Sequence, residues 1–398
     1  MDFEDLVIGS GLAALGTVLG LLADPARRIG VVCGPSEGQF MYYDARRTVP
    51  CAFLGPGGMG THWHGVVPTR AGKSADAAVD GCFAELFQRF HGAAANANWG
   101  APGMFVPWRP VRPARELQRL AREAPTRLTL LAEAATALRV DSRGVAVVCG
   151  ATRHRALRGW VAAGALHTPA LLEPMCPGAS RPTVSDHAFC YIGQVDGMRH
   201  APPQRLPGGV LHGAAYDAAG TALYSLRPAR FAFRRLDHGI EQRAVFGMPT
   251  GSAIAKIVRR LSPGLLNEAI YNRFGTWPDA QVQSVYAQVR IPDAYEIDVE
   301  RGALVPREAA IRQGTDAARR SQPYAGLRAS RRPDIHLPGI HLHGTLDLDA
   351  LHRAGLDTAD SPLRVVDAAA LPDIGADHHS FRMMARAFER ARREVVSA

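Results

Sequence analysis

The sequence predicts an α/β protein, in which a Rossmann-like dinucleotide-binding domain carries an inserted α+β domain on an antiparallel sheet. The chain opens on a short apolar strand, Leu6–Ile8, followed by a glycine turn and an apolar helix that ends near Leu22. It closes on a strand at Leu363–Ala369, a loop and a helix with an apolar face. Between about residues 191 and 330 the pattern changes to separate strand-like pieces. We therefore expect both ends of the chain to build one domain and the middle to build a second.

The turn after the first strand has the spacing of a dinucleotide-binding fingerprint. In Gly9-Ser10-Gly11-Leu12-Ala13-Ala14, Gly9 makes the tight turn and Gly11 lets a pyrophosphate approach the backbone. Ala14 keeps the helix close to the strand. The phosphates are expected at the helix N-terminus, where free N–H groups and the helix dipole favour anions.

The second strand, Ile29–Cys33, is expected to end near the adenosine ribose, which an acidic residue usually binds. The first acid after this strand is Glu37. Two readings stay open: Glu37 binds the ribose, or backbone groups and water do so.

The length of 398 residues exceeds a typical single core, and the hydrophobic fraction of 47% supports a large buried interior. We expect residues 1–190 and 331–398 to form the cofactor-binding domain. Residues 191–330 are expected to form the substrate-binding domain.

Three features predict a cytoplasmic protein that does not enter a membrane. No run approaches the roughly 20 apolar residues that cross a bilayer. Met1–Asp5 leads directly into the first strand, without the basic and apolar regions of a signal peptide. The six cysteines show no Cys-x-x-Cys spacing, which favours reduced, buried thiols.

The formal charge of +9 does not indicate a nucleic-acid partner. Lys73 and Lys256 are the only lysines, and the arginines are spread along the whole chain. They build no single basic stripe with interleaved aromatic residues. The charge is expected to lie on a solvated surface, where part of it attracts an anionic substrate or a dinucleotide phosphate.

Other elements are expected from local signals of capping, turns and periodicity. In the first domain they are an irregular segment at Gly103–Pro113, a helix at Ala114–Ala124, strands within Arg127–Val140 and at Gly144–Cys149 joined by a turn at Asp141–Gly144, a strand at Leu157–Ala163, and a helix capped by Thr168 with Pro169 in its first turn. In the second domain they are strands at Arg230–Arg234 and Gln283–Arg290 and a helix near Ser252–Arg260.

A glycine-rich run, Gly55-Pro56-Gly57-Gly58-Met59-Gly60-Thr61-His62-Trp63-His64-Gly65, fits neither a core strand nor an amphipathic helix. Glycine lets the backbone approach a ligand closely, and the histidine and tryptophan add a reactive ring beside a flat apolar one. We expect this loop to grip a large planar cofactor. The alternative is a glycine-rich surface connection without a ligand.

Taken in order, these segments resemble the glucose–methanol–choline oxidoreductases, flavoenzymes that take a hydride from an alcohol. Residues 9–16 look like the FAD pyrophosphate loop. Residues 161–172, with Ala163, Gly164 and Thr168-Pro169, look like the family's mid-chain motif, and Ser185-Asp186-His187 is similar to the Asp-His that closes it. The final strand with Asp367 and Ala368, and the loop after it, look like the family's last strand and active-site loop. The resemblance implies bound FAD.

Within that family, residues 57–63 look most like the pyranose 2-oxidase branch, in which the histidine of a Thr-His-Trp motif attaches the flavin covalently. The resemblance makes His62 the candidate attachment point and places Gly58, Met59, Thr61 and Trp63 at the flavin. The alternative is that His62 only contacts a non-covalent FAD. His64 stands where the branch usually has a threonine, a departure that bears on oxygen reactivity.

The resemblance also implies a histidine base that takes the alcohol proton, a role that suits an imidazole because its pKa lies near working pH. The family's His-x-x-Gly-Thr segment falls on His341, and its second site residue falls on His378 in the loop after the last strand. His343 could replace His341, and His379 follows His378. The pair His378-His379 could instead be a solvated surface pair. No third ligand with convincing spacing accompanies the imidazoles, so no metal is expected.

The sequence therefore predicts an FAD-dependent oxidoreductase that acts on the alcohol group of a small molecule such as a sugar, a glycoside or a biosynthetic intermediate. Its electron acceptor is O2 or another acceptor. Two alternatives stay open: a redox-neutral enzyme of lyase or isomerase type with structural FAD, and a flavin monooxygenase. The sequence does not indicate an oligomeric state.

Overall fold

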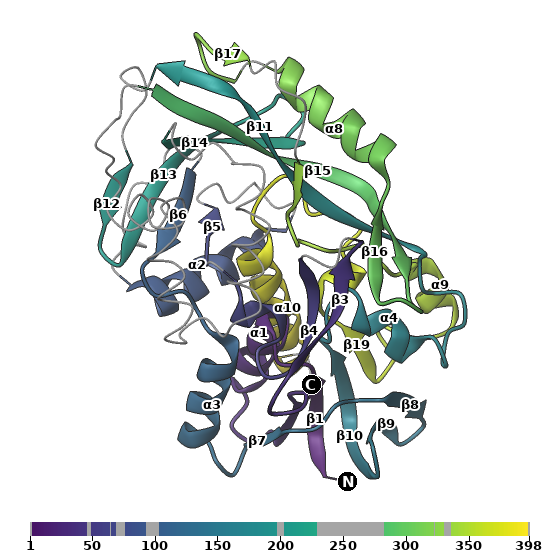
Figure 1. Ribbon diagram of the computed structural model, residues 1–398. Helices are drawn as coiled ribbons and strands as arrows, with labels where there is room; N and C mark the ends of the chain where they lie inside the picture. The colour runs from purple at the N-terminus through teal and green to yellow at the C-terminus, as the bar shows by residue number, and fades with distance from the viewer. Residues whose placement is uncertain are drawn as a thin grey trace.

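The computed structural model describes residues 2–45, 49–63, 65–68, 76–92, 103–196, 203–228, 282–321, 323–329 and 336–396. Its described part consists of two sheets with helices packed against them (Figure 1). The helices are α1 (Leu12–Leu21), α2 (Ala77–His91), α3 (Pro113–Glu123), α4 (His167–Leu172), α8 (Glu308–Arg320), α9 (Leu348–Arg353) and α10 (Ser380–Val396).

The first sheet has a parallel centre in the strand order β7-β2-β1-β10, with β19 also parallel to β10 and the hairpin β8–β9 antiparallel at the edge. The chain goes from β1 outward to β2 and later returns on the other side of β1 as β10. This reversal is the switch point beyond which ligands bind in open α/β sheets. The strands are β1 (Phe3–Ile8), β2 (Ile29–Val32), β7 (Leu128–Leu131), β8 (Ala137–Asp141), β9 (Gly144–Cys149), β10 (Thr152–Val161) and β19 (Leu363–Val365).

The first and last helices of the chain pack directly on each other beside this sheet (Figure 1). Glycines of α1 allow the close approach: a Cβ added at Gly16 would lie 2.1 Å from the carbonyl oxygen of Met384. The expected apolar face of α10 is confirmed, since Phe381, Met384, Ala385 and Phe388 are all buried. The two ends of the chain thus share one core.

The second sheet is mainly antiparallel and is dominated by β11 and β15, which pair along almost their whole length. Its outer face is covered by α8, where Tyr224 donates a hydrogen bond to the carbonyl oxygen of Ala318 at 2.9 Å. The strands are β3 (Gln39–Asp44), β4 (Pro50–Leu54), β5 (Val67–Pro68), β6 (Gly103–Pro107), β11 (Thr183–Asp196), β12 (Gln204–Leu206), β13 (Gly209–Tyr216), β14 (Ala222–Pro228), β15 (Val282–Asp298), β16 (Ala303–Pro306), β17 (Arg328–Ala329) and β18 (His336–Pro338).

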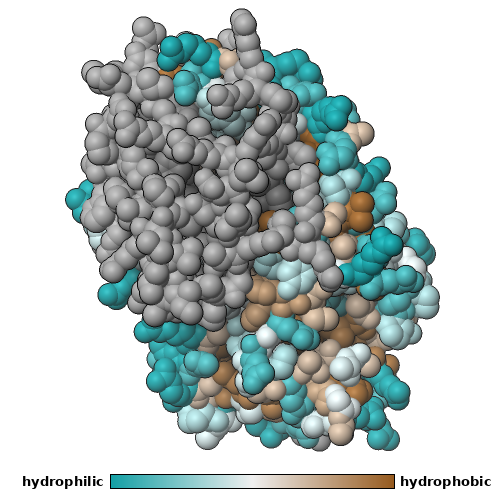
Figure 2. All heavy atoms as spheres, in the orientation of Figure 1, coloured by the Kyte–Doolittle hydropathy of each residue, from teal (hydrophilic) through white to brown (hydrophobic). Residues whose placement is uncertain are grey.

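The amphipathic helices α3 and α8 turn charged faces to solvent. Figure 2 shows hydrophilic residues where Figure 1 draws these two helices, at the lower left and the upper right. Their opposite faces are buried, with Leu117 and Leu120 in α3 and Ile311 and Ala318 in α8. This is the pattern of surface helices that each cover one part of a core.

The last strand ends earlier than expected, at Val365, because Ala368–Ala370 form a 3-10 turn. Expectations about local structure are wrong at two further places. Gly103–Pro113 is not irregular throughout, because residues 103–107 form β6, which pairs with β5 and β13. Thr168 does not cap α4: the N-cap is Leu166, and the Thr168 hydroxyl bonds to Asp367 instead. In both places contacts between distant segments outweigh the local signal. The expected elements at 230–234 and 252–260 lie outside the described residues.

The second sheet takes strands from segments on both sides of residue 191, since β3–β6 come from residues 39–107. The proposed domain limits of 1–190 with 331–398, and 191–330, stay a prediction. All six cysteines are buried and free of disulfides. Among the helices that the structure describes, none has the length and apolar character to cross a membrane.

Candidate functional site

The carboxyl ends of β1, β10 and β19 meet at one edge of the first sheet, and the predicted fingerprint lies there. Gly9 has φ +114°, and a Cβ at this position would lie 2.1 Å from the carbonyl oxygen of Ala162. Only glycine fits this turn. Gly11 is the N-cap of α1 and has no side chain, so no N-cap side chain accepts the first N–H groups of the helix. Ala14 is buried against the core, as the packing role requires.

The glycine-rich loop is tied to this edge by Ser10. Its hydroxyl donates to the carbonyl oxygen of Cys33 at 3.0 Å and accepts the N–H of Gly57 at 2.9 Å. Gly57 and Gly58 both have positive φ values, +88° and +50°. A Cβ at Gly58 would lie 3.7 Å from the Cα of Gly11, so the loop stands directly beside the start of α1.

The aromatic part of the loop packs into the protein. The His62 ring is buried, with ring centroids 5.2 Å from Phe40 and 5.4 Å from Phe53. The ring centroids of Trp63 and Phe381 are 6.4 Å apart. The carbonyl oxygen of Trp63 accepts a hydrogen bond from Arg112 at 2.6 Å. These contacts hold the two rings in fixed places.

The roles of Met59, Thr61 and Glu37 at a cofactor stay predictions, and the structure gives only their places. The Thr61 hydroxyl donates to the carbonyl oxygen of Pro56 at 3.0 Å and so closes the loop on itself. Met59 lies in the short 3-10 helix Gly58–Thr61, and Glu37 is exposed on the turn after β2. His64 lies outside the described residues.

Asp367 joins the last strand to the mid-chain motif. Its carboxylate accepts the N–H of Gly164 at 2.7 Å, the Thr168 hydroxyl at 2.5 Å and the N–H of Ala369 at 2.9 Å. Gly164 follows Ala163 at the end of β10, and Ala368 begins the short turn after Asp367. Burial raises the pKa of Asp367 above its ordinary value. The predicted residues 163, 164, 367 and 368 are thus brought together at the same edge as Gly9.

The predicted catalytic histidines gather on the inner side of the second sheet, in the loop between β19 and α10 and in the segment after β18. Ring centroids of His341 and His378 lie 5.5 Å apart, and those of His341 and His379 lie 5.2 Å apart. His343 lies 6.3 Å from His379 by the same measure. The structure therefore places all four imidazoles in one cluster.

Exposure divides this cluster into two pairs. His341 and His378 are half-buried, whereas His343 and His379 are buried. Burial lowers the pKa of His343 and lowers that of His379 well below its ordinary value. A buried neutral imidazole has little access to substrate, so His341 and His378 are better placed for proton transfer. The solvated-pair alternative does not describe His379.

The loop that carries His378 is held by side chains of the second sheet. Gln288 donates to the carbonyl oxygen of Ala376 at 2.7 Å, and Arg290 forms an ion pair with Asp373 at 2.6 Å. Tyr216 donates to Asp377. Since the same loop continues from Asp367, one chain segment connects the sheet edge at Gly9 with the histidine cluster.

The segment that carries His341 is held by a buried carboxylate, Asp186 of β11. It accepts the N–H of His341 at 2.7 Å and that of Ile340 at 3.1 Å. Burial raises the pKa of Asp186 to about 7, although these hydrogen bonds oppose the shift.

A fifth imidazole, His187, belongs to the cluster and was not among the predicted site residues. Its Nδ1 lies 2.9 Å from Nδ1 of His341. The Asp186-His187 dipeptide was visible in the sequence as part of a family-like motif. Nothing local showed that a side chain 154 positions before His341 would touch it.

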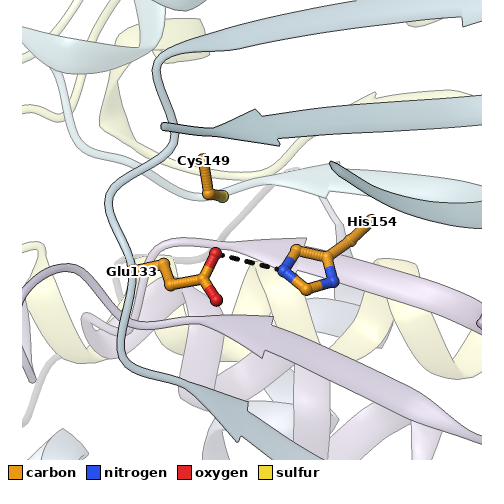
Figure 3. Close-up of side chains that lie close together, drawn as sticks. All are labelled: Glu133, Cys149 and His154. Atoms are coloured by element: carbon orange, nitrogen blue, oxygen red, sulfur yellow. Dashed lines mark hydrogen bonds and ion pairs between the residues drawn. The ribbon is translucent and has the colours of Figure 1, made fainter. Parts of the chain in front are cut away.

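A separate group of ligand-type side chains lies on the first sheet (Figure 3). Ligand atoms of Glu133, Cys149 and His154 all lie within 4.8 Å of one another. Nε2 of His154 is 3.2 Å from the Glu133 carboxylate, and burial with the nearby carboxylate raises the pKa of the Cys149 thiol to about 11. These direct contacts clamp the segment after β7 to the hairpin β9–β10. That the chain binds no metal stays a prediction.

No protein-family model matches the chain, and no curated protein matches its sequence. Among solved structures, the chain is similar to pyridoxine 4-oxidase from Mesorbium loti, with a TM-score of 0.52 and 14% identity. The match covers 100% of this chain and 99% of that chain. At this identity the likeness shows the fold alone. It confirms the predicted class, an α/β protein with a Rossmann-like domain and a second domain on an antiparallel sheet.

Proposed function

We propose that the protein is an FAD-dependent oxidoreductase that removes a hydride from the CH–OH group of a small molecule. One observation carries the proposal. The turn that Asp367 closes beside Gly164, just after β19, leads directly into the loop that presents the half-buried His378 beside His341. A dinucleotide edge and an accessible imidazole are the two parts that such a reaction needs.

The residues present fit a dinucleotide. The Gly9 turn, the uncapped start of α1 and the adjoining glycine loop leave backbone N–H groups and little side-chain bulk at the sheet edge. Gly9, Gly11, Gly58 and Gly164 would hold the cofactor there. When bound, FAD supplies the acceptor for the hydride.

The chain's own residues have three tasks in this mechanism. His378, or His341 with it, takes the hydroxyl proton of the alcohol, because an imidazole with a pKa near neutrality serves as a general base. Asp186 holds the backbone of His341. The third task is packing: the buried ring of His379 lies against that of His341, and the buried ring of His343 lies beside that of His379.

The substrate class is a small-molecule alcohol. The structural neighbour is named as an oxidase of pyridoxine, which supports a small-molecule substrate and an acceptor such as O2. A sugar, a glycoside or a biosynthetic intermediate is equally compatible with the described residues.

Covalent attachment of the flavin through His62 belongs to the same proposal, and it depends on the Thr61-His62-Trp63 motif. The structural likeness does not support the pyranose 2-oxidase branch as such. The buried His62 ring nonetheless packs against two phenyl rings, those of Phe40 and Phe53, so its position is ordered.

An anaerobic absorption spectrum with a panel of alcohols tests the proposal. We expect a yellow protein whose flavin is bleached by substrate in the absence of oxygen. Flavin that stays oxidised during turnover would favour the redox-neutral class, and a requirement for NAD(P)H would favour a monooxygenase. If denatured protein releases NAD or no nucleotide, the FAD assignment is wrong.

A further inference from the structure

His187 touches a predicted catalytic histidine from a neighbouring strand. We propose that His187 is a positioning residue, which fixes the tautomer of His341 so that Nε2 of His341 carries the lone pair that accepts a proton. This inference rests on the proposed function, because the tautomer of His341 matters to chemistry only if a proton is taken there.

The Nε2 atom of His187 lies 2.7 Å from the carbonyl oxygen of Gly375. A carbonyl oxygen only accepts hydrogen bonds, so Nε2 carries the hydrogen. His187 is 1% exposed, and burial together with the neighbouring His341 lowers its pKa well below the ordinary value. The ring is therefore neutral, and its Nδ1 is an acceptor.

A hydrogen bond joins the two rings. Nδ1 of His187 and Nδ1 of His341 are 2.9 Å apart, and one of them must donate. Because His187 accepts, Nδ1 of His341 carries the hydrogen. A neutral imidazole has one N–H, so Nε2 of His341 holds the lone pair.

This tautomer suits a general base. When a hydroxyl proton moves to Nε2 of His341, an N–H bond replaces the O–H bond and the electron pair of that bond stays on oxygen. The hydrogen bond to His187 is kept throughout and becomes charge-assisted, so the imidazolium is stabilised without rearrangement. His187 thus does for His341 what the orienting partner of a catalytic histidine generally does.

The surroundings support a fixed geometry. β11 holds His341 at its backbone through Asp186, and the carbonyl oxygen of His187 accepts the N–H of Gly339 at 2.7 Å. Other charged or titratable groups face the pair from the packed elements. They are Arg290 of β15, His343 of the same segment, and His378 and His379 of the loop after β19. Arg290 further disfavours a charged His187.

A purely structural role, anchoring the loop at Gly375, is the alternative, and two variants separate them. In His187→Asn the amide oxygen lies near the place of Nδ1 and can accept from His341, but the side chain is too short for Gly375. In His187→Gln the amide can reach Gly375, and the acceptor beside His341 is lost. We expect flavin reduction to slow roughly 10- to 100-fold in His187→Gln, the usual scale for an orienting partner, and clearly less in His187→Asn. The reverse order would overturn the proposal.

Nitrogen NMR of imidazole-labelled protein tests the tautomer without any turnover. We expect wild-type His341 as the Nδ1–H tautomer, and a shift toward Nε2–H in His187→Leu, with His341→Gln used to assign the signal. An Nε2–H tautomer in the wild type would overturn the inference whatever the activity. If the Nδ1–H tautomer is found but no alcohol reduces the flavin, the proposed function fails while the bond between the rings stands.

Discussion

Two buried aspartates do the same structural work at the two edges of the candidate site. Asp367 accepts hydrogen bonds from Gly164, Thr168 and Ala369, and Asp186 accepts them from Ile340 and His341. Each carboxylate joins segments that are far apart in the chain. The difference lies in what they hold: Asp367 holds a glycine turn, whereas Asp186 holds a titratable imidazole. We infer that one edge is organised for cofactor binding and the other for proton transfer.

The largest effect is expected at the first edge. Asp367→Ala leaves the N–H of Gly164, the Thr168 hydroxyl and the N–H of Ala369 without their acceptor, at a cost of at least about 3 kcal/mol in the free energy of unfolding. Urea unfolding and the flavin content of the purified protein measure the result. Asp367→Asn, which keeps the shape and one oxygen, should lose less. A variant with wild-type stability and full flavin content would show that Asp367 does not organise this edge for cofactor binding.

The next largest effect is expected at the histidine cluster, and it should change the rate of flavin reduction but not stability. His378→Ala should keep its fold and flavin but slow flavin reduction by substrate at least roughly 100-fold, which corresponds to about 2.7 kcal/mol in the barrier. Adding His341→Ala should cost less than the product of the single effects, since residues that act as a unit are not additive.

Two buried neighbours serve as controls for that experiment. His379→Ala and His343→Ala should be mild in flavin reduction, because both rings are buried and neutral. Stopped-flow spectra without oxygen measure these variants, with His341→Ala alone included. If His379→Ala is damaging and His378→Ala harmless, our register through the loop is wrong by one residue. If neither His378→Ala nor His379→Ala slows flavin reduction, the proposed proton transfer in alcohol oxidation is wrong.

A smaller effect concerns pH. The pKa of Asp186 is raised by burial from 3.8 to about 7 in the folded protein, so the folded state binds more protons between these values. The contribution of Asp186 to stability is therefore full below about pH 4, falls as pH rises to about 7, and is constant above. The wild-type minus Asp186→Asn difference in unfolding free energy should follow this course. Asp367, whose pKa is also raised, adds a trend of the same sign in both proteins. A difference in unfolding free energy that does not change with pH would contradict the raised pKa of Asp186.

The smallest effect on folding or rate is expected at His62. The His62 variant tests whether this side chain also binds the flavin covalently. Acid precipitation should leave the yellow colour in the wild-type pellet and release it from His62→Ala. The absorbance of pellet and supernatant decides. A colourless wild-type pellet ends the covalent proposal and leaves FAD binding intact.

Features of the fold that depend on neighbouring residues could be predicted from the sequence. The Gly9–Ala14 turn, the helix α1 and the apolar face of α10 depend on residues within a few positions of each other, so spacing and periodicity predict them. The same holds for the hairpin at Asp141–Gly144. Where sequence reasoning went wrong, at Thr168 and at residues 103–107, a partner from a distant segment decided the outcome.

The candidate site shows the same division. The sequence shows where the histidines stand and that His341 and His378 occupy family-like positions. Chain folding makes His341 and His378 half-buried, buries His343 and His379, and brings His187 against His341. Burial and cross-strand hydrogen bonds arise from packing between β11, β15 and the final loop, which lie far apart in the chain; His187 and Gly375, for example, are 188 positions apart. Local residue patterns carry no signal for contacts of that range, and burial by those contacts lowers the pKa values of His187, His343 and His379.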